Sequence, residues 1–329
     1  MPNASDFPAP LPAEAIPARL LWRGDSLAPG TGHIAIPAEV VEELDRIVAQ
    51  LDRDPIPLLL LRPEDFALDA SRAFMARVKQ SLDAGPGFAI VDRLPVGRWS
   101  ESGSRAVWWL LAALVARPVA QKWDGTSIYD VRDLGKPPGN GVRPDVTNAE
   151  QNFHTDNSYN LQPPHYVGLL CLRTAREGGI SGIVSFASAH EEMRRRHPDL
   201  LSRLYAPFHF DRQREHAPDD TMTTWHPMLE REDGRLIARL SLFQVRNGYK
   251  MKGVELEAEG AAALEAFEAI LMAPGMAANF TFEPGQMQLL DNRALGHRRT
   301  AFRDWPEAER KRLLIRLWLR DRGSRAYHG

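Results

Sequence analysis

Short apolar stretches separated by turn-forming residues recur throughout the second half of the chain, and they restrict the possible folds more than any other feature. Stretches of this length are typical of buried strands. The tetrapeptide Glu232-Asp233-Gly234-Arg235 predicts a hairpin turn between two of them. We predict strands within 119–131, 165–173, 182–186, 207–211, 226–231, 235–240, 278–283, 286–291 and 312–319. This series predicts a β-barrel or jelly roll with helices packed outside.

The first third of the chain has the apolar spacing of helices instead. Helices are expected from Val40 to Leu51, from Phe74 to Leu82 and from Trp99 to Ala116, with a short strand at Phe88–Val91. Two further helices are expected at 187–205 and 257–271, and residues 1–36 should wrap the surface. We predict an α+β, mainly β chain: one domain over 1–329, with an N-terminal wrap and helices over 1–84 and a double-stranded β-helix (jelly-roll) core over 85–320.

The overall charge gives no reason to expect nucleic acid or a membrane as a partner. The chain has 41 basic and 43 acidic residues and a formal net charge of −2, so a small molecule is the default ligand.

The cysteine count and the N-terminal sequence bear on the location of the protein. The one cysteine, Cys171, excludes an intramolecular disulfide and fits a reducing compartment. Met1–Pro12 does not have the pattern of a signal peptide, and the apolar run Val107–Val115 is too short to span a bilayer. A cytoplasmic location is expected, and homo-oligomers stay open.

Residues 133–150 form a polar segment with three Pro and three Gly that cannot bury much apolar surface. Loops of this length in a compact domain are functional or disordered. Because the segment ends just before the first candidate metal ligand, it is either an active-site lid or a mobile surface loop.

His154-Thr155-Asp156 is the first part of a candidate metal site. On a strand, residues i and i+2 point to the same face, so an imidazole and a carboxylate could reach one metal ion together. His297 follows 141 residues after Asp156. Two histidines and one carboxylate are the ligand set of non-haem Fe(II) oxygenases. A structural zinc site would need a fourth ligand, and the surroundings of Cys171 are those of a buried core residue.

Arg312 and Arg316 are the second part, because on one strand they share a face with Leu314 and Trp318. A buried guanidinium needs an anionic partner, and its planar fork matches a carboxylate. The distal carboxylate of 2-oxoglutarate is such a partner. A structural ion pair with Asp or Glu is the alternative.

The order His154-Thr155-Asp156, Gly178-Gly179-Ile180-Ser181, Asp291-Asn292 with His297, then Arg312 and Arg316 resembles the TauD/TfdA (taurine dioxygenase) family. The resemblance covers roughly residues 85–320 and implies a clavaminate synthase-like jelly roll. It implies an enzyme that oxidises a small molecule, by hydroxylation as the default, with O2 and 2-oxoglutarate as co-substrates and succinate as a product.

The resemblance also implies residue roles. His154, Asp156 and His297 would bind Fe(II), and Arg312 would pair with the distal carboxylate of 2-oxoglutarate. Arg316 would stand near that carboxylate or near the substrate. The family has Thr where this chain has Ser181, which keeps the hydroxyl that would help to hold 2-oxoglutarate. Asp156 disfavours halogenation, because halogenases of this type replace the carboxylate ligand.

The substrate pocket is less defined. Asn157 and Tyr159 follow the metal motif and could line the entrance, and Arg316 would favour an anionic or amino-acid-like substrate if 2-oxoglutarate does not occupy it. Phe243, Gln244, Arg246 and Tyr249 form another polar-aromatic stretch. For each of these, a loop or barrel-rim position is the alternative. Two other function classes stay open: a cupin-type metal enzyme that does not use 2-oxoglutarate, and a non-catalytic ligand-binding member of the fold.

Overall fold

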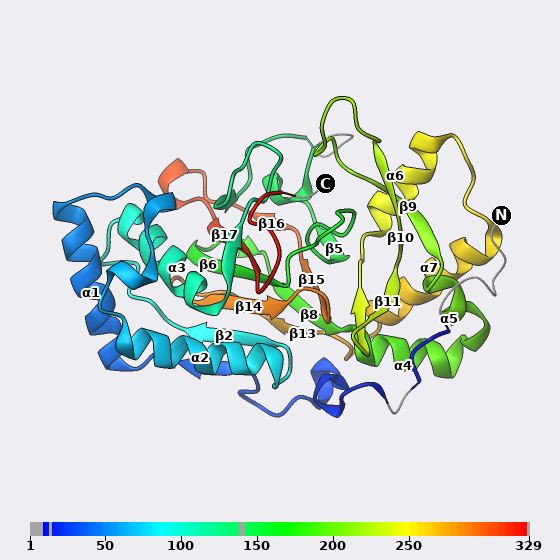
Figure 1. Cartoon of the computed structure of the whole chain (residues 1–329), viewed down its shortest axis with the longest axis horizontal. Coiled ribbons are helices and arrows are strands. Elements are labelled where there is room, and N and C mark those ends of the chain that lie inside the picture. Colours follow the sequence, from blue (N-terminus) through cyan, green and yellow to red (C-terminus); the bar gives the residue numbers. More distant parts are fainter. Residues whose placement is uncertain (1–8, 13–14, 138–141, 328–329) are drawn as a thin grey trace.

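Two β-sheets form the centre of the molecule in the computed structural model, which describes residues 9–12, 15–137 and 142–327 (Figure 1). The strands of the larger, seven-stranded sheet run in the order β1-β2-β14-β6-β17-β3, with β4 also paired to β17. Their bounds are β1 His33–Ala35, β2 Phe88–Asp92, β3 Arg117–Val119, β4 Tyr129–Val131, β6 Tyr166–Arg173, β14 Met287–Asp291 and β17 Leu313–Arg320. The order jumps back and forth along the sequence, as expected for a jelly roll rather than a meander.

The smaller sheet carries the candidate metal ligands. Its strands run in the order β13-β8-β15-β5, all antiparallel where paired. Their bounds are β5 Gln151–His154, β8 Ser181–Ser185, β13 Ala278–Phe280 and β15 Leu295–Arg299. A short ribbon of β7 (Glu177–Gly178) and β16 (Phe302–Arg303) extends this end of the barrel. Gly178 is required there, because a Cβ on it would lie 2.3 Å from the carbonyl oxygen of Ala301.

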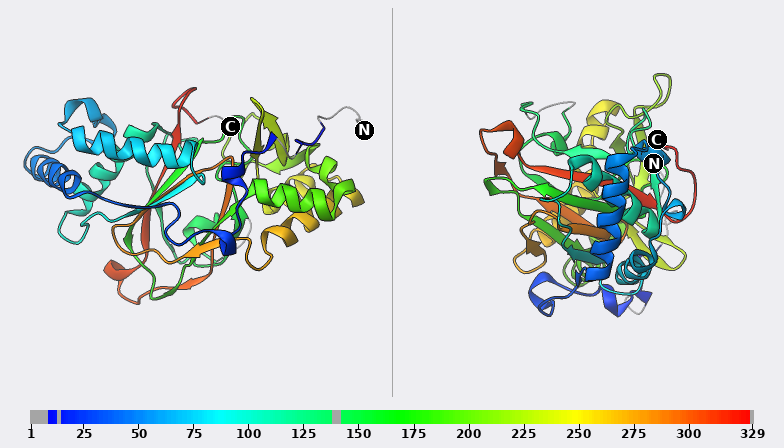
Figure 2. Two further views of the ribbon diagram at one scale, coloured as in Figure 1. Left: turned by 90° about the horizontal axis from the view of Figure 1, so that it is seen from below. Right: turned by 90° about the vertical axis from the view of Figure 1, so that its left-hand side faces the viewer.

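Three helices cover the outer face of the larger sheet: α1 Ala38–Arg53, α2 Asp69–Asp83 and α3 Glu101–Val115 (Figures 1 and 2). The alternation of β17 explains this packing. Leu313, Ile315, Leu317 and Leu319 join the apolar cluster beneath these helices. Leu314 and Trp318 belong to clusters on the other face, toward the barrel interior. Leu314, Arg316 and Trp318 alternate along β17 as predicted, whereas Arg312 lies just before the strand, and the pairing of β17 with β6 shifts register between Leu313 and Leu314.

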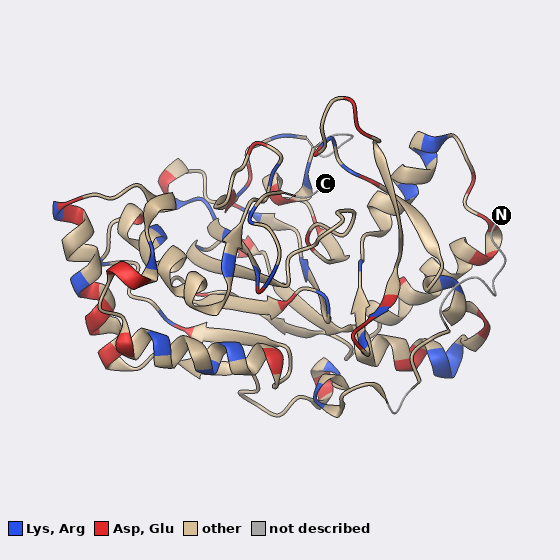
Figure 3. Cartoon of the chain, viewed as in Figure 1, with Lys and Arg blue, Asp and Glu red and all other residues tan. Residues whose placement is uncertain are grey.

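The opposite end of the molecule contains the remaining helices and two hairpins (Figure 1). The helices are α4 Phe186–Arg196, α5 Pro198–Leu204, α6 Leu242–Lys252 and α7 Ala258–Leu271, and the hairpins pair β9 Pro207–Asp211 with β10 Thr223–Pro227 and β11 Leu229–Glu232 with β12 Arg235–Ala238. Charged residues of both signs lie on α1 to α5, whereas those of α6 are all basic and those of α7 are all acidic (Figure 3). Among the described residues, no helix is both long and apolar enough to cross a membrane.

The predicted double-stranded β-helix core with flanking helices is confirmed, with three corrections. The helix expected over 187–205 is broken at His197, because Pro198 begins a new helix. The stretch containing Phe243 and Tyr249 is a helix, α6, which the sequence did not predict. Strand β1, from the predicted N-terminal wrap, pairs in parallel with β2. The sheet thus crosses the expected boundary at residue 85, and we propose that the described chain forms one domain.

Candidate metal centre and 2-oxoglutarate site

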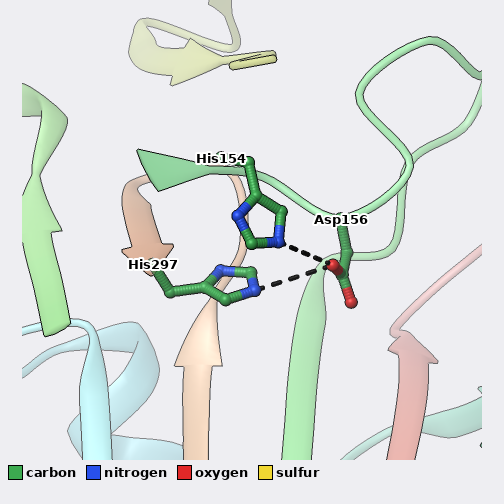
Figure 4. A group of neighbouring side chains, drawn as sticks. All are labelled: His154, Asp156 and His297. Carbon is green, nitrogen blue, oxygen red and sulfur yellow. Dashed lines mark ion pairs between the residues drawn. The ribbon is translucent and has the colours of Figure 1, made fainter. Parts of the chain in front are cut away.

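The pairing of β5 with β15 brings the two candidate histidines together. His154 and His297 are direct partners across this antiparallel pair, and their ring centroids lie 4.2 Å apart. The Nε2 atoms of His154 and His297 lie 3.4 and 3.6 Å from Oδ1 of Asp156 (Figure 4). Potential ligand atoms of the three residues all lie within 4.8 Å of one another. The three residues predicted from the sequence therefore form one cluster that could hold a metal ion.

Asp156 reaches the cluster from a turn rather than from a strand, because β5 ends at His154. The side chain of Asn292 fixes this turn. Its Oδ1 accepts the backbone N–H of Asp156 at 2.8 Å, and its Nδ2 donates to the carbonyl oxygen of Asp156 at 2.9 Å. Two hydrogen bonds to one residue hold its backbone in a single position. Asn292 belongs to the quoted Asp-Asn motif, which thus has a structural role.

The protonation states of the cluster suit metal binding. Burial alone would raise the pKa of Asp156, but Arg316 and the hydrogen bonds with the two histidines hold it well below its ordinary value. Burial, and then the neighbouring His154, lower the pKa of His297. An ionised carboxylate and a neutral imidazole both offer lone pairs. Two histidines and one carboxylate, with no cysteine, fit Fe(II) and leave coordination positions for co-substrates.

A second buried site lies around Arg312 and Arg299. The two side chains are 5% and 6% exposed, and both guanidinium groups lie over the ring of Phe302, at 5.1 and 4.8 Å from its centroid. Burial, together with the proximity of Arg299, lowers the pKa of Arg312 to about 10, and burial lowers that of Arg299 to about 10 as well. Two adjacent buried cations require an anion.

Several donors at this site have no hydrogen-bond partner among the described residues. They are Nη1 of Arg312, Nε and Nη1 of Arg299, and Nε2 of Gln288. Gln288 accepts the hydroxyl of Ser181 at 3.1 Å, and Ser181 is the cross-strand partner of Arg299. Buried donors are rarely left unpaired. Four such donors with two positive charges fit the carboxylate of a bound dicarboxylate such as 2-oxoglutarate.

Arg316 lies at the metal cluster. Its Nη1 is 3.4 Å from Oδ2 of Asp156, its Nη2 is 3.1 Å from Oδ2 of Asp145, and its Nε donates to Gln121 at 2.8 Å. Its positive charge is thus already balanced by two carboxylates. This pairing argues against the expectation that Arg316 is free to attract an anionic substrate group.

A cavity of about 310 Å³ opens beside the cluster and is lined by His154 and Asp156. Asn157 and Tyr159, expected at the entrance, line it too but are 5% and 1% exposed. The Tyr159 hydroxyl lies 2.8 Å from that of Tyr327, near the end of the described chain.

Two other segments line the cavity. Helix α6 contributes Phe243, Gln244 and Arg246, and the predicted lid segment contributes Arg143, Pro144, Asp145 and Glu150. Tyr249 instead packs against His209. Of the lid segment, 138–141 lies outside the described residues.

Sequence reasoning missed three residues at these sites, Arg299, Gln288 and Asp145, and it quoted Asn292 in a motif without giving it a role. One signal was available, because Arg299 stands two positions after His297 and therefore points to the same face of β15. Gln288 and Asp145 meet the site only through contacts between distant segments, which no local pattern reveals.

Comparison with known proteins agrees with this geometry. The sequence model of the family described as "Taurine catabolism dioxygenase TauD, TfdA family" matches residues 54–318. The FR-33289 synthase of Streptomyces rubellomurinus is 27% identical over 301 residues, which cover 88% of this chain and 84% of that protein.

Solved structures share the fold. Asparagine oxygenase in complex with Fe(II), 2S,3S-3-hydroxyasparagine and succinate superposes with a TM-score of 0.64, at 19% identity over 88% of this chain and 94% of that one. The non-haem iron oxygenase OrfP with Fe and alpha-ketoglutaric acid gives a TM-score of 0.62, at 13% identity over 88% and 94%. OrfP has also been solved with Fe, succinate and (3S)-hydroxy-L-Arg, with a TM-score of 0.64 at 14% identity over 89% and 95%.

Proposed function

The chain belongs to the TauD/TfdA family of dioxygenases, and from this premise we propose that it hydroxylates a small molecule bound in the cavity beside His154, Asp156 and His297. The family membership makes the chain an Fe(II)- and 2-oxoglutarate-dependent oxygenase. The hydroxylation and the residue roles are our proposal. The observation that supports it most is the group of unpaired buried donors around Arg312 in the same barrel as the His-Asp-His cluster.

In this proposal, His154, Asp156 and His297 hold Fe(II), and Arg312 and Arg299 hold the distal carboxylate of 2-oxoglutarate. Ser181 assists through Gln288: its hydroxyl donates to Oε1 of Gln288 and so leaves Nε2 of Gln288 as a donor for the carboxylate. When bound, Fe(II) with 2-oxoglutarate and O2 supplies the oxidation, with succinate and CO2 as by-products. The chain itself orients the substrate and keeps water away from the buried side of the cavity.

The orientation of Asp156 is the clearest contribution of the chain. Trp318 and Arg316 both contact Oδ2, so Oδ1 is the oxygen that faces the two histidines. Gln151 now lies 2.9 Å from Nε2 of His154, and a metal ion would replace this contact.

We further propose that the substrate resembles an amino acid, because asparagine oxygenase and OrfP have been solved with hydroxyasparagine and hydroxyarginine. The cupin-type alternative has no dicarboxylate that would account for the two buried arginines. The non-catalytic alternative does not agree with the family membership or with an intact His-Asp-His cluster.

Two measurements test the proposal. Fe(II) and 2-oxoglutarate added without O2 should give a weak visible charge-transfer band, and O2 with a small-molecule panel should then give succinate. His154→Ala should lose both signals while keeping its circular dichroism spectrum. His33→Ala is the control, since His33 is exposed on β1. A wild-type protein that gives neither band nor succinate would contradict the proposed function.

A further inference from the structure

Asp145 lines the cavity beside the metal cluster and has one buried carboxylate oxygen without a hydrogen-bond partner in the described structure. The residue is 4% exposed and belongs to the segment 133–150, several residues of which line the cavity. Its Oδ2 pairs with Arg316, whereas its Oδ1 is buried and has no hydrogen-bond partner within the described parts of the chain. A carboxylate oxygen out of contact with water and without a donor costs free energy. A donor supplied by a ligand would remove that cost.

The position of this oxygen relates it to the reaction. One guanidinium, that of Arg316, contacts both Asp145 and the metal-cluster residue Asp156. A group that binds Oδ1 of Asp145 is therefore linked to the metal cluster through a single arginine side chain. This contact would hold the rest of a small molecule next to the oxidising centre.

The charges of the cavity lining indicate which donor fits. Each arginine in the lining already has an acidic partner: Arg143 pairs with Glu215 at 3.0 Å, Arg246 with Glu268 at 3.2 Å, and Arg316 with Asp145 and Asp156. Glu150 also lines the cavity and has no ionic partner among the residues that the structure describes. An anionic ligand would find no unpaired arginine here, whereas a cationic or zwitterionic one gains attraction.

We propose that Oδ1 of Asp145 accepts an N–H of an ammonium group on the substrate, and that the substrate is a small amine, such as an amino acid, rather than a purely anionic molecule. This inference rests on the proposed function and adds a specificity-determining residue to it. It differs from a purely structural role, in which Asp145 only fastens its segment to Arg316.

Matched substrate pairs test the inference. The probes are L-amino acids and the corresponding 2-hydroxy acids, which share the carboxylate and the side chain and differ only in the ammonium group. A hydrogen bond to a charged group contributes about 1.5–3 kcal/mol, so the wild type should prefer the amine member by roughly 10- to 100-fold in kcat/KM for succinate release. In Asp145→Asn the preference should fall to within about 3-fold, mainly through KM.

Glu215→Gln is the matched control. It breaks the ion pair between Glu215 and Arg143 of the same segment and leaves the Asp145 carboxylate intact, so both members of each substrate pair should change equally and the amine preference should persist. A purely structural role of Asp145 would change both members of each pair equally. An unchanged preference in Asp145→Asn, a wild type that accepts both members equally, or a panel without any active amine would each overturn the inference. The charge-transfer band separates the hypotheses: a wild type without the band contradicts the proposed function, whereas a band without amine preference contradicts only the role of Asp145.

Discussion

Trp318 donates its indole N–H to Oδ2 of Asp156 at 2.6 Å, the same oxygen that Arg316 approaches to 3.4 Å. The two residues lie on the interior face of β17, two positions apart. One strand thus positions the carboxylate of the metal cluster through one oxygen and leaves the other toward the histidines. Partners of this kind fix the orientation of a metal ligand and its charge.

We expect Trp318→Phe to weaken Fe(II) binding by about 10- to 100-fold, because the carboxylate loses its shortest hydrogen bond while Arg316 keeps part of its orientation. Anaerobic titration of Fe(II) with saturating 2-oxoglutarate would measure this through the charge-transfer band. Trp109→Phe is the control. It also loses a buried indole hydrogen bond, to the carbonyl oxygen of Leu61, but Trp109 lies on α3, in the apolar cluster on the helix-covered face of the larger sheet. Equal affinities in the two variants would show that Trp318 does not support the metal.

The sequence predicted the three residues of the metal cluster, but alternation along a strand explains only part of their arrangement. Arg316 and Trp318 share a face of β17, whereas Asp156 lies in a turn and His297 meets His154 through the pairing of β5 with β15. Asp145 was missed, since only the folded chain brings it to Arg316. Helix α6 was missed because Asn247-Gly248 lies in its middle, and this dipeptide normally favours a turn. Gly248 is needed there, since a Cβ would lie 2.5 Å from the carbonyl oxygen of His209.

Arg312→Met should raise the stability of the ligand-free protein while abolishing 2-oxoglutarate binding. The guanidinium is buried beside a second cation and has an unpaired nitrogen, so replacing it with an apolar side chain of similar length removes an electrostatic cost. We expect a gain of roughly 1–3 kcal/mol in the free energy of unfolding. Thermal melting with and without 2-oxoglutarate measures both effects.

Wild-type protein should melt at a higher temperature when 2-oxoglutarate is added, and Arg312→Met should not respond. Arg299→Met should show the same pattern with a smaller loss of response, because its Nη2 also donates to the carbonyl oxygens of Thr147 and Ala149. If Arg312→Met destabilised the ligand-free protein, the guanidinium would have a structural partner and the proposed anion site would lose its main support.

The ion pair between Arg143 and Glu215 should help to keep water out of the cavity beside the metal cluster. Both side chains are partly buried, at 17% and 15% exposure, and they join the segment before β5 to the loop between β9 and β10. Arg143→Met should let water reach the cavity and increase the succinate formed without substrate, by about 2- to 5-fold if the pair contributes about 0.5–1 kcal/mol. Lys136→Met, on an exposed part of the same segment, should leave this background rate unchanged. Equal background rates in the wild type and Arg143→Met would contradict a role in excluding water.

His226 should make the fold sensitive to mild acid. Burial, and then the charge of Arg239, lower its pKa to about 4, and its Nε2 has no partner in the described structure. In the unfolded chain a histidine has its ordinary pKa of about 6.5. Between these values the unfolded state binds more protons, so stability is complete above about pH 6.5 and is lost as pH falls toward 4. The shift sets an upper limit of about 3 kcal/mol on this loss of stability, and the remaining exposure of the side chain reduces the limit to roughly 1–2 kcal/mol.

His226→Gln, measured by urea unfolding at about pH 7.5 and about pH 5, should lose that much less stability between the two conditions than the wild type. His33→Gln, at an exposed position on β1, should keep the wild-type difference; if His226→Gln kept it too, the acid sensitivity would have to arise from other buried groups such as His209, whose pKa burial also lowers.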